Sequence, residues 1–376
     1  MAGIYIHIPF CKKVCSYCDF YKTSVLNLIP EFISAVKKEI EIKKDFLKNE
    51  MIETIYFGGG TPSLLSYSQL MEITNQIDKV YNVSNECEIT MEANPDDLSE
   101  EYLKSIIQYT PVNRLSIGIQ SFNDDHLRLL QRRHNSLQSI SCINKAVKYG
   151  FSNISIDIIY GIPGTDLTIW SEEIQNVFDL DVQHISAYCL TIEKGTLLYR
   201  NAEKGYIIEL PEEDIKYQYS ALCELAKNYK YQHYEISNFA KEGYISKHNS
   251  NYWKEKKYLG FGPSAHSYTF TTRLWNDSNL RNYILQISNN SLATNSEELD
   301  LITQYNEYIM ISLRTMWGID ALKIKMNLGE KLYRSFITSV NRYVKTGQIK
   351  RNGDQYIINE EDWMIADYLI SDLLIV

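Results

Sequence analysis

Apolar positions along the first 190 residues follow two spacings in turn, one typical of strands and the other typical of helices. Residues 3–10 alternate and are rich in Ile and Tyr, and residues 54–57 form a short apolar run, so both indicate strands. Between them, residues 30–47 carry apolar side chains at helical spacing behind Pro30, which suits a first helical turn. The same alternation predicts strands at 88–92, 114–120, 153–160 and 184–190 and helices at 68–80, 100–108, 124–130, 136–149 and 167–180.

This regular alternation of strands and helices predicts the fold class. Near-continuous apolar strands that alternate with helices are typical of a parallel sheet covered by helices, so we predict an α/β fold. About six strand–helix units fit before residue 200, which favours a partial (βα)6 barrel over a flat, doubly wound sheet. Periodicity alone does not separate these two arrangements.

The pattern changes after about residue 200. A helix is predicted at 212–229, a loop-rich aromatic stretch follows at 231–275, and the chain is mainly helical from about residue 298. Two short segments, 347–350 and 354–357, resemble a β-hairpin that follows two helices. We therefore predict three regions, namely a partial barrel at 1–200, a region that completes the barrel at 201–295, and a smaller, mainly helical, winged-helix-like domain at 296–376.

Composition and charge argue against several classes of protein. The apolar fraction of 44% and the charged fraction of 23% are ordinary for a soluble globular chain. The net charge of −9 argues against a nucleic-acid partner, because binding phosphate groups needs a concentrated basic surface. Apolar runs such as 154–162 are much shorter than the roughly 20 residues that cross a bilayer, and the strand pattern starts too near Met1 for a signal peptide. We therefore expect a cytoplasmic protein.

Seven cysteines are present, and an odd number without a secretory context argues against a disulfide framework. Cys11, Cys15 and Cys18 fall on one short loop with the spacing C-x3-C-x2-C. Three thiolates can each ligate one iron of a 4Fe–4S cubane and leave the fourth iron without a protein ligand. The amino and carboxyl groups of an amino acid can chelate that open iron. If this amino acid carries a sulfonium group, the sulfonium then lies within electron-transfer range of the cluster. The other four cysteines lie among apolar residues and indicate core positions: Cys87, Cys142, Cys189 and Cys223.

Zinc is the alternative metal for this loop. Structural zinc prefers four closed protein ligands, and the loop offers three thiolates. His7 is a candidate for the fourth ligand, although it lies within the predicted strand. The cluster is therefore predicted ahead of zinc and ahead of three unligated thiols.

Two further motifs, taken with the cysteine loop, resemble a known superfamily. Tyr17 comes directly before the third cysteine, and residues 58–62 (Gly-Gly-Gly-Thr-Pro) come directly after the second predicted strand. Together they resemble the radical S-adenosylmethionine superfamily. The resemblance implies a 4Fe–4S cluster and S-adenosylmethionine as cofactors, with the Tyr17 ring near the adenine and the glycine segment near the methionyl amino group. A glycine triplet by itself also fits an ordinary turn.

Four segments resemble one group within that superfamily, the coproporphyrinogen III dehydrogenase group. They are residues 5–11 (Tyr-Ile-His-Ile-Pro-Phe-Cys), 92–95 (Glu-Ala-Asn-Pro), 116–122 (Ser-Ile-Gly-Ile-Gln-Ser-Phe) and 157–164 (Asp-Ile-Ile-Tyr-Gly-Ile-Pro-Gly). This group contains the oxygen-independent oxidase HemN and the haem chaperone HemW, and the likeness covers nearly the whole chain. Carried over position by position, it implies an S-adenosylmethionine site lined by Tyr5, Gly59, Gly60, Thr61, Glu92, Gln120, Arg132 and Asp157.

The side chains of this implied site suit the ligand. Glu92 and Asp157 are carboxylates at predicted strand ends, where they can accept hydrogen bonds from ribose hydroxyls or from an ammonium group. Arg132 offers a fork to a carboxylate, and Gln120 can both donate and accept. Taken singly, each residue also fits a surface salt bridge or a helix cap.

Two features differ from the oxidase pattern. Phe20 stands where that pattern has a further cysteine. The oxidase also carries an N-terminal arm, and only four residues precede Tyr5 here, so we expect no such arm. Both features argue against decarboxylation of a porphyrinogen.

One more motif favours the chaperone. Residues 248–253 (His-Asn-Ser-Asn-Tyr-Trp) match the H-N-x-x-Y-W pattern that characterises HemW. The resemblance implies that His248 ligates haem iron axially, with Tyr252 and Trp253 against the macrocycle. The alternative is that these residues anchor a loop and that His248 is only hydrogen-bonded. His266, in a segment that resembles the cofactor-facing segment of the group, is a second candidate.

The resemblance thus implies a haem chaperone of the HemW type, which binds haem and a cluster coordinated by S-adenosylmethionine and delivers haem to acceptor proteins that require it. No catalytic residue is assigned. The alternatives are an oxygen-independent coproporphyrinogen III dehydrogenase and a zinc-stabilised binding protein. Peripheral membrane association and a homodimer are left open, as is covalent attachment of the haem.

Overall fold

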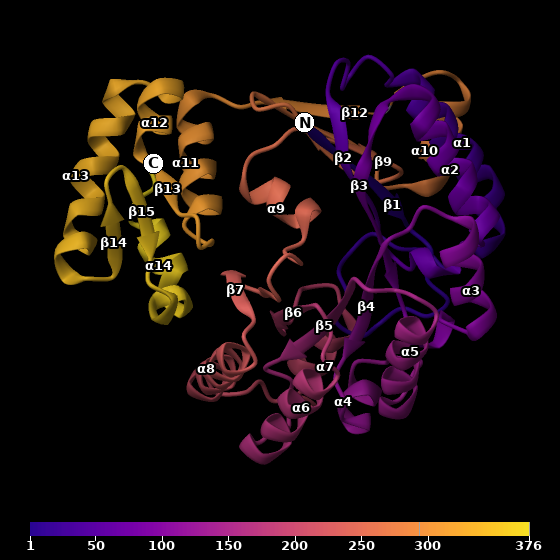
Figure 1. The fold of residues 1–376 in the computed structure, drawn as a ribbon, viewed down its shortest axis with the longest axis horizontal. Helices are drawn as coiled ribbons and strands as arrows, with labels where there is room; N and C mark the ends of the chain where they lie inside the picture. Colours follow the sequence, from indigo (N-terminus) through magenta and orange to yellow (C-terminus); the bar gives the residue numbers. More distant parts are fainter. Residues whose placement is uncertain (293, 376) are drawn as a thin grey trace.

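The structure is a computed structural model that describes residues 1–292 and 294–375 (Figure 1). Within these residues, six parallel strands lie side by side in chain order. Because each strand pairs with the next one along the chain, the strand order does not reverse as it does in a doubly wound sheet. This order confirms the predicted α/β fold with a partial barrel. The strands are β1 (Ala2–Ile8), β2 (Met51–Gly59), β3 (Asn82–Ala93), β4 (Arg114–Gln120), β5 (Ile154–Tyr160) and β6 (His184–Cys189).

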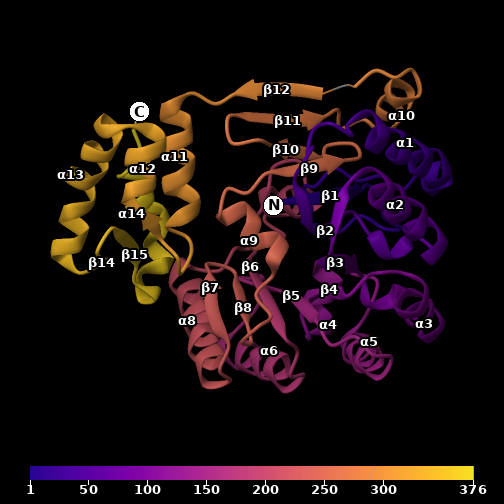
Figure 2. The ribbon, with the colours of Figure 1, turned by 45° about the horizontal axis from the view of Figure 1, so that its top comes forward.

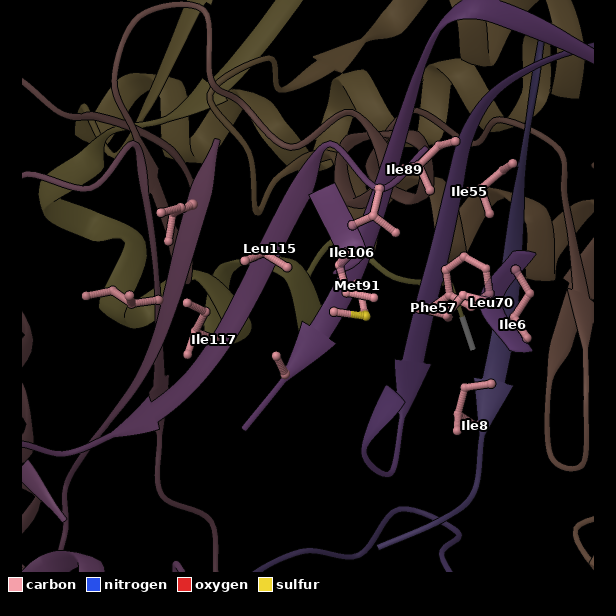
Figure 3. Packing of buried hydrophobic residues seen from close by; sticks show 14 of the residues in the cluster. Ile6, Ile8, Ile55, Phe57, Leu70, Ile89, Met91, Ile106, Leu115 and Ile117 are labelled. Carbon is pink, nitrogen blue, oxygen red and sulfur yellow. The ribbon is translucent and has the colours of Figure 1, made fainter. Parts of the chain in front are cut away.

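The connecting helices cover the outer face of these strands (Figure 2). Alternate strand side chains pack beneath them, as Ile6 and Phe57 do in Figure 3. Because successive strand side chains point to opposite faces, the intervening positions face the inside of the barrel, and there the chain carries polar residues such as Tyr5, Tyr56 and Glu92. The helices are α1 (Ile29–Ile42), α2 (Tyr67–Val80), α3 (Glu100–Tyr109), α4 (Asp124–Leu129), α5 (Ser136–Lys148) and α6 (Leu167–Asp179).

Short strands extend the sheet at both edges. One edge continues from β1 through a parallel β9 into antiparallel β10, β11 and β12, and the other continues from β6 through antiparallel β8 into β7. The prediction of a loop-rich stretch at 231–275 is therefore wrong, because strands this short show no clear period. The added strands are β7 (Gln232–Glu235), β8 (Asn238–Ala240), β9 (Tyr258–Phe261), β10 (His266–Tyr268), β11 (Thr272–Asn276) and β12 (Thr294–Glu298).

Further helices surround this sheet, and one of them lies on its inner face. That helix, α9 (Lys247–Trp253), packs against β1 and β2 (Figure 1). The others are α7 (Leu197–Glu203), α8 (Glu212–Asn228), α10 (Leu280–Ser288) and the short 3-10 helices Leu26–Leu28, Pro62–Leu64 and Pro95–Asp97, while the 3-10 helix Glu360–Ile365 belongs to the C-terminal region. Among the described residues, no helix combines the length and the apolar composition needed to cross a membrane.

The C-terminal region has a hydrophobic core of its own, built around Tyr305, Phe336 and Tyr356. Its sheet has the order β13-β15-β14 and, together with its helices, lies on the other side of α9 from β1 and β2 (Figure 1). The ion pair between His233 and Glu360, at 3.0 Å, ties it to the barrel. The hairpin after two helices is present as expected, while the boundaries at 200 and 295 stay a prediction. The elements are α11 (Leu301–Ser312), β13 (Ile319–Asp320), α12 (Ala321–Leu328), α13 (Glu330–Thr346), β14 (Ile349–Asn352), β15 (Gln355–Ile358) and α14 (Ala366–Ser371).

Candidate cofactor site

The carboxyl ends of the parallel strands surround a cavity of about 470 Å³. Parallel strands place all their carboxyl ends at one edge of a sheet, and ligands bind at this edge in α/β folds. Most of the residues that the sequence assigns to cofactors line this cavity, although their roles as ligands stay predictions. They are Cys11, Cys15, Tyr17, Cys18, Gly59, Gly60, Thr61, Glu92, Gln120, Arg132 and Asp157.

Backbone hydrogen bonds close the cysteine loop at its two ends. Cys11 N donates to Thr23 O at 2.9 Å, and Thr23 N donates to Pro9 O at 2.7 Å. All three thiols are free, with Cys11 buried and Cys15 and Cys18 half-buried. The loop therefore leaves β1 and presents its three sulfurs at the cavity.

Two neighbouring side chains donate hydrogen bonds to these sulfurs. Thr61 Oγ1 lies 3.5 Å from Cys11 Sγ, and Arg132 Nη1 lies 3.4 Å from Cys15 Sγ. Such donors stabilise a thiolate and tune an iron–sulfur centre. Among the residues that the structure describes, no three His, Cys, Asp or Glu side chains are grouped to hold one metal ion. Zinc needs such a group, whereas a cubane takes each thiolate on a separate iron, so the donor set fits the cluster better than zinc.

The glycine segment at the end of β2 brings its backbone close to the cysteine loop. Gly59 has a φ of +106°, and a Cβ there would lie 2.5 Å from the His7 ring. Gly60 N donates to Ile8 O at 2.7 Å, and a Cβ on Gly60 would lie 2.8 Å from the carbonyl oxygens of Ile8 and Phe10. Glycine alone fits both positions, and the same lack of side chains lets a ligand approach the backbone.

Two half-buried carboxylates face the cavity from β3 and β5, which lie on either side of β4. Glu92 accepts hydrogen bonds from Tyr56 Oη at 2.9 Å and from Gly59 N at 3.0 Å, and Asp157 accepts one from Ser116 Oγ at 3.1 Å. Burial raises the pKa of both carboxyls, and the nearby charge of Asp157 helps to raise the pKa of Glu92 to about 7. A cationic ligand would relieve this repulsion and hold both groups ionised.

The half-buried guanidinium of Arg132 also faces the cavity. Arg132 Nη2 donates to Asn94 Oδ1 at 2.5 Å and to Gly118 O at 2.7 Å, while Nη1 contacts Cys15. Its Nε is buried and has no hydrogen-bond partner among the described residues. A buried donor without a partner is costly, so a ligand with an acceptor group fits here. S-adenosylmethionine carries a carboxylate, an ammonium and a sulfonium, which complement one guanidinium and two carboxylates.

The raised pKa of Glu92 predicts that the ligand-free protein loses stability as the pH rises. The folded state binds more protons than the unfolded state between the usual pKa of 4.5 and the folded pKa of about 7, so the free energy of unfolding falls across this window. We expect Glu92→Gln to remove part of the fall in melting temperature between about pH 5 and about pH 8. Thermal denaturation at both pH values measures it, and an unchanged pH dependence would contradict the assignment.

The matched control for this experiment is Glu235→Gln. Glu235 is buried, and burial raises its pKa to about 7 as well, yet it lies at the end of β7 and does not line the cavity. It should remove a separate part of the same pH dependence. S-adenosylmethionine should reduce the contribution of Glu92 and leave that of Glu235 unchanged.

Comparisons with known proteins place the chain in a family. The Radical SAM superfamily matches residues 5–175. The chain is 33% identical to the haem chaperone HemW of Bacillus subtilis, over 100% of this chain and 99% of the relative, and 35% identical to HemW of Lactococcus lactis, over 89% and 88%. The chain belongs to the HemW family of the radical SAM superfamily.

A solved structure shares the fold of this HemW family member. Coproporphyrinogen III oxidase (HemN) from Escherichia coli, a radical SAM enzyme, superposes with a TM-score of 0.84 over 99% of this chain and 89% of that chain. The two sequences are 19% identical. The likeness to HemN therefore supports the architecture, including the C-terminal region, and says nothing about a shared activity.

Gln120 and Tyr5, two other residues that the sequence assigns to the site, differ in whether they reach the cavity. Gln120 ends β4 with a φ of +70° and lines the cavity. Tyr5 is not among the residues that line it. Its Oη lies 3.0 Å from His7 Nδ1, and its ring stacks on Tyr56 with centroids 6.1 Å apart. In this member of the HemW family, Tyr5 therefore packs against Tyr56, which does line the cavity. The role of Tyr5 as a ligand stays a prediction.

The H-N-x-x-Y-W motif, residues 248–253, lies in α9, and its Asn249 lines the same cavity as the three loop cysteines. His248 is 2% exposed, with Nδ1 2.8 Å from Thr54 Oγ1 and Nε2 2.9 Å from Tyr252 Oη. This is the arrangement of the alternative interpretation, in which His248 is a hydrogen-bonded anchor. His266 lies exposed at the start of β10. Haem ligation by either residue stays a prediction.

Sequence reasoning missed several residues that line the cavity. Ser116 pairs with Glu92 across β3 and β4, and Ser186 pairs with Asp157 across β5 and β6. The signal was the period of two within each strand, since Tyr56 comes two positions before the glycine segment and shares its face. The missed residues include Tyr56, Asn94, Ser116, Ser186, Tyr188 and Asn249.

Proposed function

We propose that this chain is a haem chaperone, which binds haem and a 4Fe–4S cluster coordinated by S-adenosylmethionine and delivers the haem to proteins that require it. The observation that carries the proposal is the full-length similarity to relatives named haem chaperone HemW, at 33% identity for the one from Bacillus subtilis. The cavity supports it, because thiols, glycines, carboxylates and a guanidinium of suitable chemistry meet there.

Different groups around the cavity would hold different parts of the cofactors. The thiolates of the cysteine loop would hold the cluster, and the glycine segment would let the methionyl part of the ligand approach the backbone. Arg132 would bind the ligand carboxylate with its free Nε, while Glu92 and Asp157 would accept hydrogen bonds from its ammonium and ribose groups. When bound, the cluster supplies an electron-transfer centre with one iron open to the ligand.

The alternative activity, oxidation of coproporphyrinogen III, has less support. Phe20, at the position where the oxidase pattern has a cysteine, lines the mouth of the cavity and is 65% exposed. A phenyl ring can neither ligate iron nor transfer a proton. The likeness to HemN at 19% identity supports the fold alone.

Partners other than haem are predicted from the sequence and its family. We propose haem-requiring acceptor proteins, and we keep the absence of a nucleic-acid partner and the cytoplasmic location as predictions. Peripheral membrane association, a homodimer and covalent attachment of haem remain alternatives that purification and mass measurement can test.

A haem-transfer assay run beside an oxidase assay tests the proposal. Anaerobically reconstituted protein is loaded with one equivalent of haemin and mixed with a haem-requiring apo-cytochrome, and the Soret band follows the transfer. We expect the haem to bind and to pass to the acceptor, with no conversion of coproporphyrinogen III in the parallel assay. Conversion to protoporphyrinogen IX with consumption of S-adenosylmethionine would contradict the proposal and establish the oxidase.

A further inference from the structure

The sulfurs of Cys11 and Cys15 each receive a hydrogen bond from a side chain that lines the cavity. Thr61 Oγ1 lies 3.5 Å from Cys11 Sγ, and Arg132 Nη1 lies 3.4 Å from Cys15 Sγ. Thr61 comes shortly after β2 and Arg132 shortly after α4, so the two donors belong to distant parts of the chain. Their geometry therefore depends on a group that contacts both of them.

Asn94 is that group. Its Nδ2 donates to Thr61 Oγ1 at 3.4 Å, and its Oδ1 accepts from Arg132 Nη2 at 2.5 Å. Asn94 comes directly after β3 and lines the cavity, and its backbone N–H donates to Ser63 Oγ at 3.2 Å. Thr61, Asn94 and Arg132 thus form one hydrogen-bonded set, here called the donor chain, with a cysteine sulfur at each end.

The chemistry of these groups fixes the direction of every bond in the donor chain. A guanidinium can only donate, so the Asn94 atom that faces Arg132 must be the carbonyl oxygen. The amide nitrogen then faces Thr61 and donates to its hydroxyl oxygen, which leaves the hydroxyl proton for Cys11 Sγ. Each end of the donor chain therefore presents a proton to a sulfur.

The donor chain lies in surroundings that strengthen these bonds. Thr61 is 3% exposed, and Asn94 and Arg132 are half-buried. Where the local dielectric constant is low, hydrogen bonds in a chain polarise and strengthen one another. Gly118 O also accepts from Arg132 Nη2 at 2.7 Å and so holds the guanidinium from the side of β4.

Hydrogen bonds to the sulfurs are one of the factors that set the reduction potential of an iron–sulfur cluster. The reduced form carries one more negative charge than the oxidised form, so a donated proton stabilises the reduced form more strongly. Loss of a donor therefore makes the reduction potential more negative.

We propose that Asn94 is a positioning residue, which orients the donors at both ends of the donor chain and so raises the reduction potential of the cluster. Asn94 acts through Thr61 and Arg132 and contacts neither sulfur itself. The assignment rests on the proposed function, because it requires the 4Fe–4S cluster, and it adds a role for a cavity residue that had none.

A redox titration of the anaerobically reconstituted protein, followed by electron paramagnetic resonance, tests this assignment. Asn94→Asp keeps the size of the side chain and the acceptor for Arg132, but a carboxylate cannot donate to Thr61. The Thr61 hydroxyl should then donate to the carboxylate and leave Cys11 Sγ. We expect the equilibrium constant for reduction to fall roughly tenfold or more, which is about 59 mV for one electron. Iron should stay at about four atoms per chain, because all three thiolates remain.

Asn113→Asp is the matched control, because it adds the same charge at the opposite end of the strands. The Asn113 amide is also bonded on both sides, to Ile89 N at 2.9 Å and to Cys87 O at 2.8 Å. It comes directly before β4, however, and does not line the cavity. We expect this variant to change the reduction constant by less than about threefold, since solvent and salt screen its charge.

A double-mutant cycle separates positioning from the added charge. Thr61→Val removes the hydroxyl, and in the wild-type background it should lower the reduction constant by roughly fivefold, as expected for one hydrogen bond. In the Asn94→Asp background it should have almost no effect, because the hydroxyl no longer bonds Cys11. An equal effect of Thr61→Val in both backgrounds would overturn the assignment and leave the cluster standing.

The other outcomes also decide the matter. A wild-type potential in Asn94→Asp, or loss of its iron although the thiolates are intact, would overturn the positioning role. An equal shift in Asn94→Asp and Asn113→Asp would overturn it too, because charge alone would then explain both. Wild type that holds no cluster would overturn this assignment and the proposed cofactor site together.

Discussion

Replacing any one of Cys11, Cys15 and Cys18 by Ala is expected to abolish the brown chromophore of the anaerobically reconstituted protein. Iron should fall from about four atoms per chain to less than about one, because each thiolate is the only protein ligand of its iron. The side chains that hydrogen-bond these sulfurs, Thr61 and Arg132, act as donors and do not replace a thiolate. Iron and sulfide analysis with a visible spectrum measures the loss.

A thiol outside the loop provides the control. Cys189 is exposed and lines the same cavity, yet it is the last residue of β6 and lies outside the cysteine loop, so Cys189→Ala should keep a full complement of iron. Circular dichroism should show that all four variants fold. Full iron in Cys15→Ala, or a colourless wild type that contains zinc, would contradict the cluster.

Gly60→Ala is expected to weaken S-adenosylmethionine binding by roughly tenfold or more and to lower the iron content as well. The new Cβ would lie 2.8 Å from the carbonyl oxygens of Ile8 and Phe10, and these are backbone atoms at the entrance to the cysteine loop. The backbone cannot turn aside as a flexible side chain can, so β2 and the loop must move apart. Isothermal titration of the reconstituted protein measures the affinity.

A glycine elsewhere in the chain, Gly205, provides the control for Gly60→Ala. Its replacement measures the general cost of losing a glycine. Gly205 has a φ of +74°, and a Cβ there would meet nothing within 4 Å. Asn tolerates this backbone conformation, so Gly205→Asn should bind S-adenosylmethionine as the wild type does. Wild-type affinity and iron content in Gly60→Ala would show that the close approach of Gly60 to the loop is unimportant.

The parallel strands were predictable because their apolar faces are long enough to show a period. The strand predicted at 114–120 matches β4 in full, whereas the one predicted at 54–57 extends through Gly59. Glycines usually indicate a turn, but here Gly58 and Gly59 still pair with β1. The strands β9–β12 were not predicted, because such short strands form through their neighbours and not through their own pattern.

The candidate site was predictable only in part. The spacing of the cysteines and the motifs at strand ends indicated which residues meet, because parallel strands bring their carboxyl ends to one edge. The contact between Arg132 and Cys15, which are 117 positions apart, depends on the tertiary fold and has no local signal. The burial of His248 also has no local signal in the sequence, because it depends on the packing of α9 against Thr54.

The measurement that tests the central claim most directly is the electron paramagnetic resonance spectrum of the reduced protein with and without S-adenosylmethionine. The claim is that three thiolates leave one iron open and that this iron binds the amino-acid end of the ligand. The account predicts a signal of a reduced 4Fe–4S cluster whose g-values shift when S-adenosylmethionine is added. A cluster signal that stays unchanged at saturating ligand would contradict it.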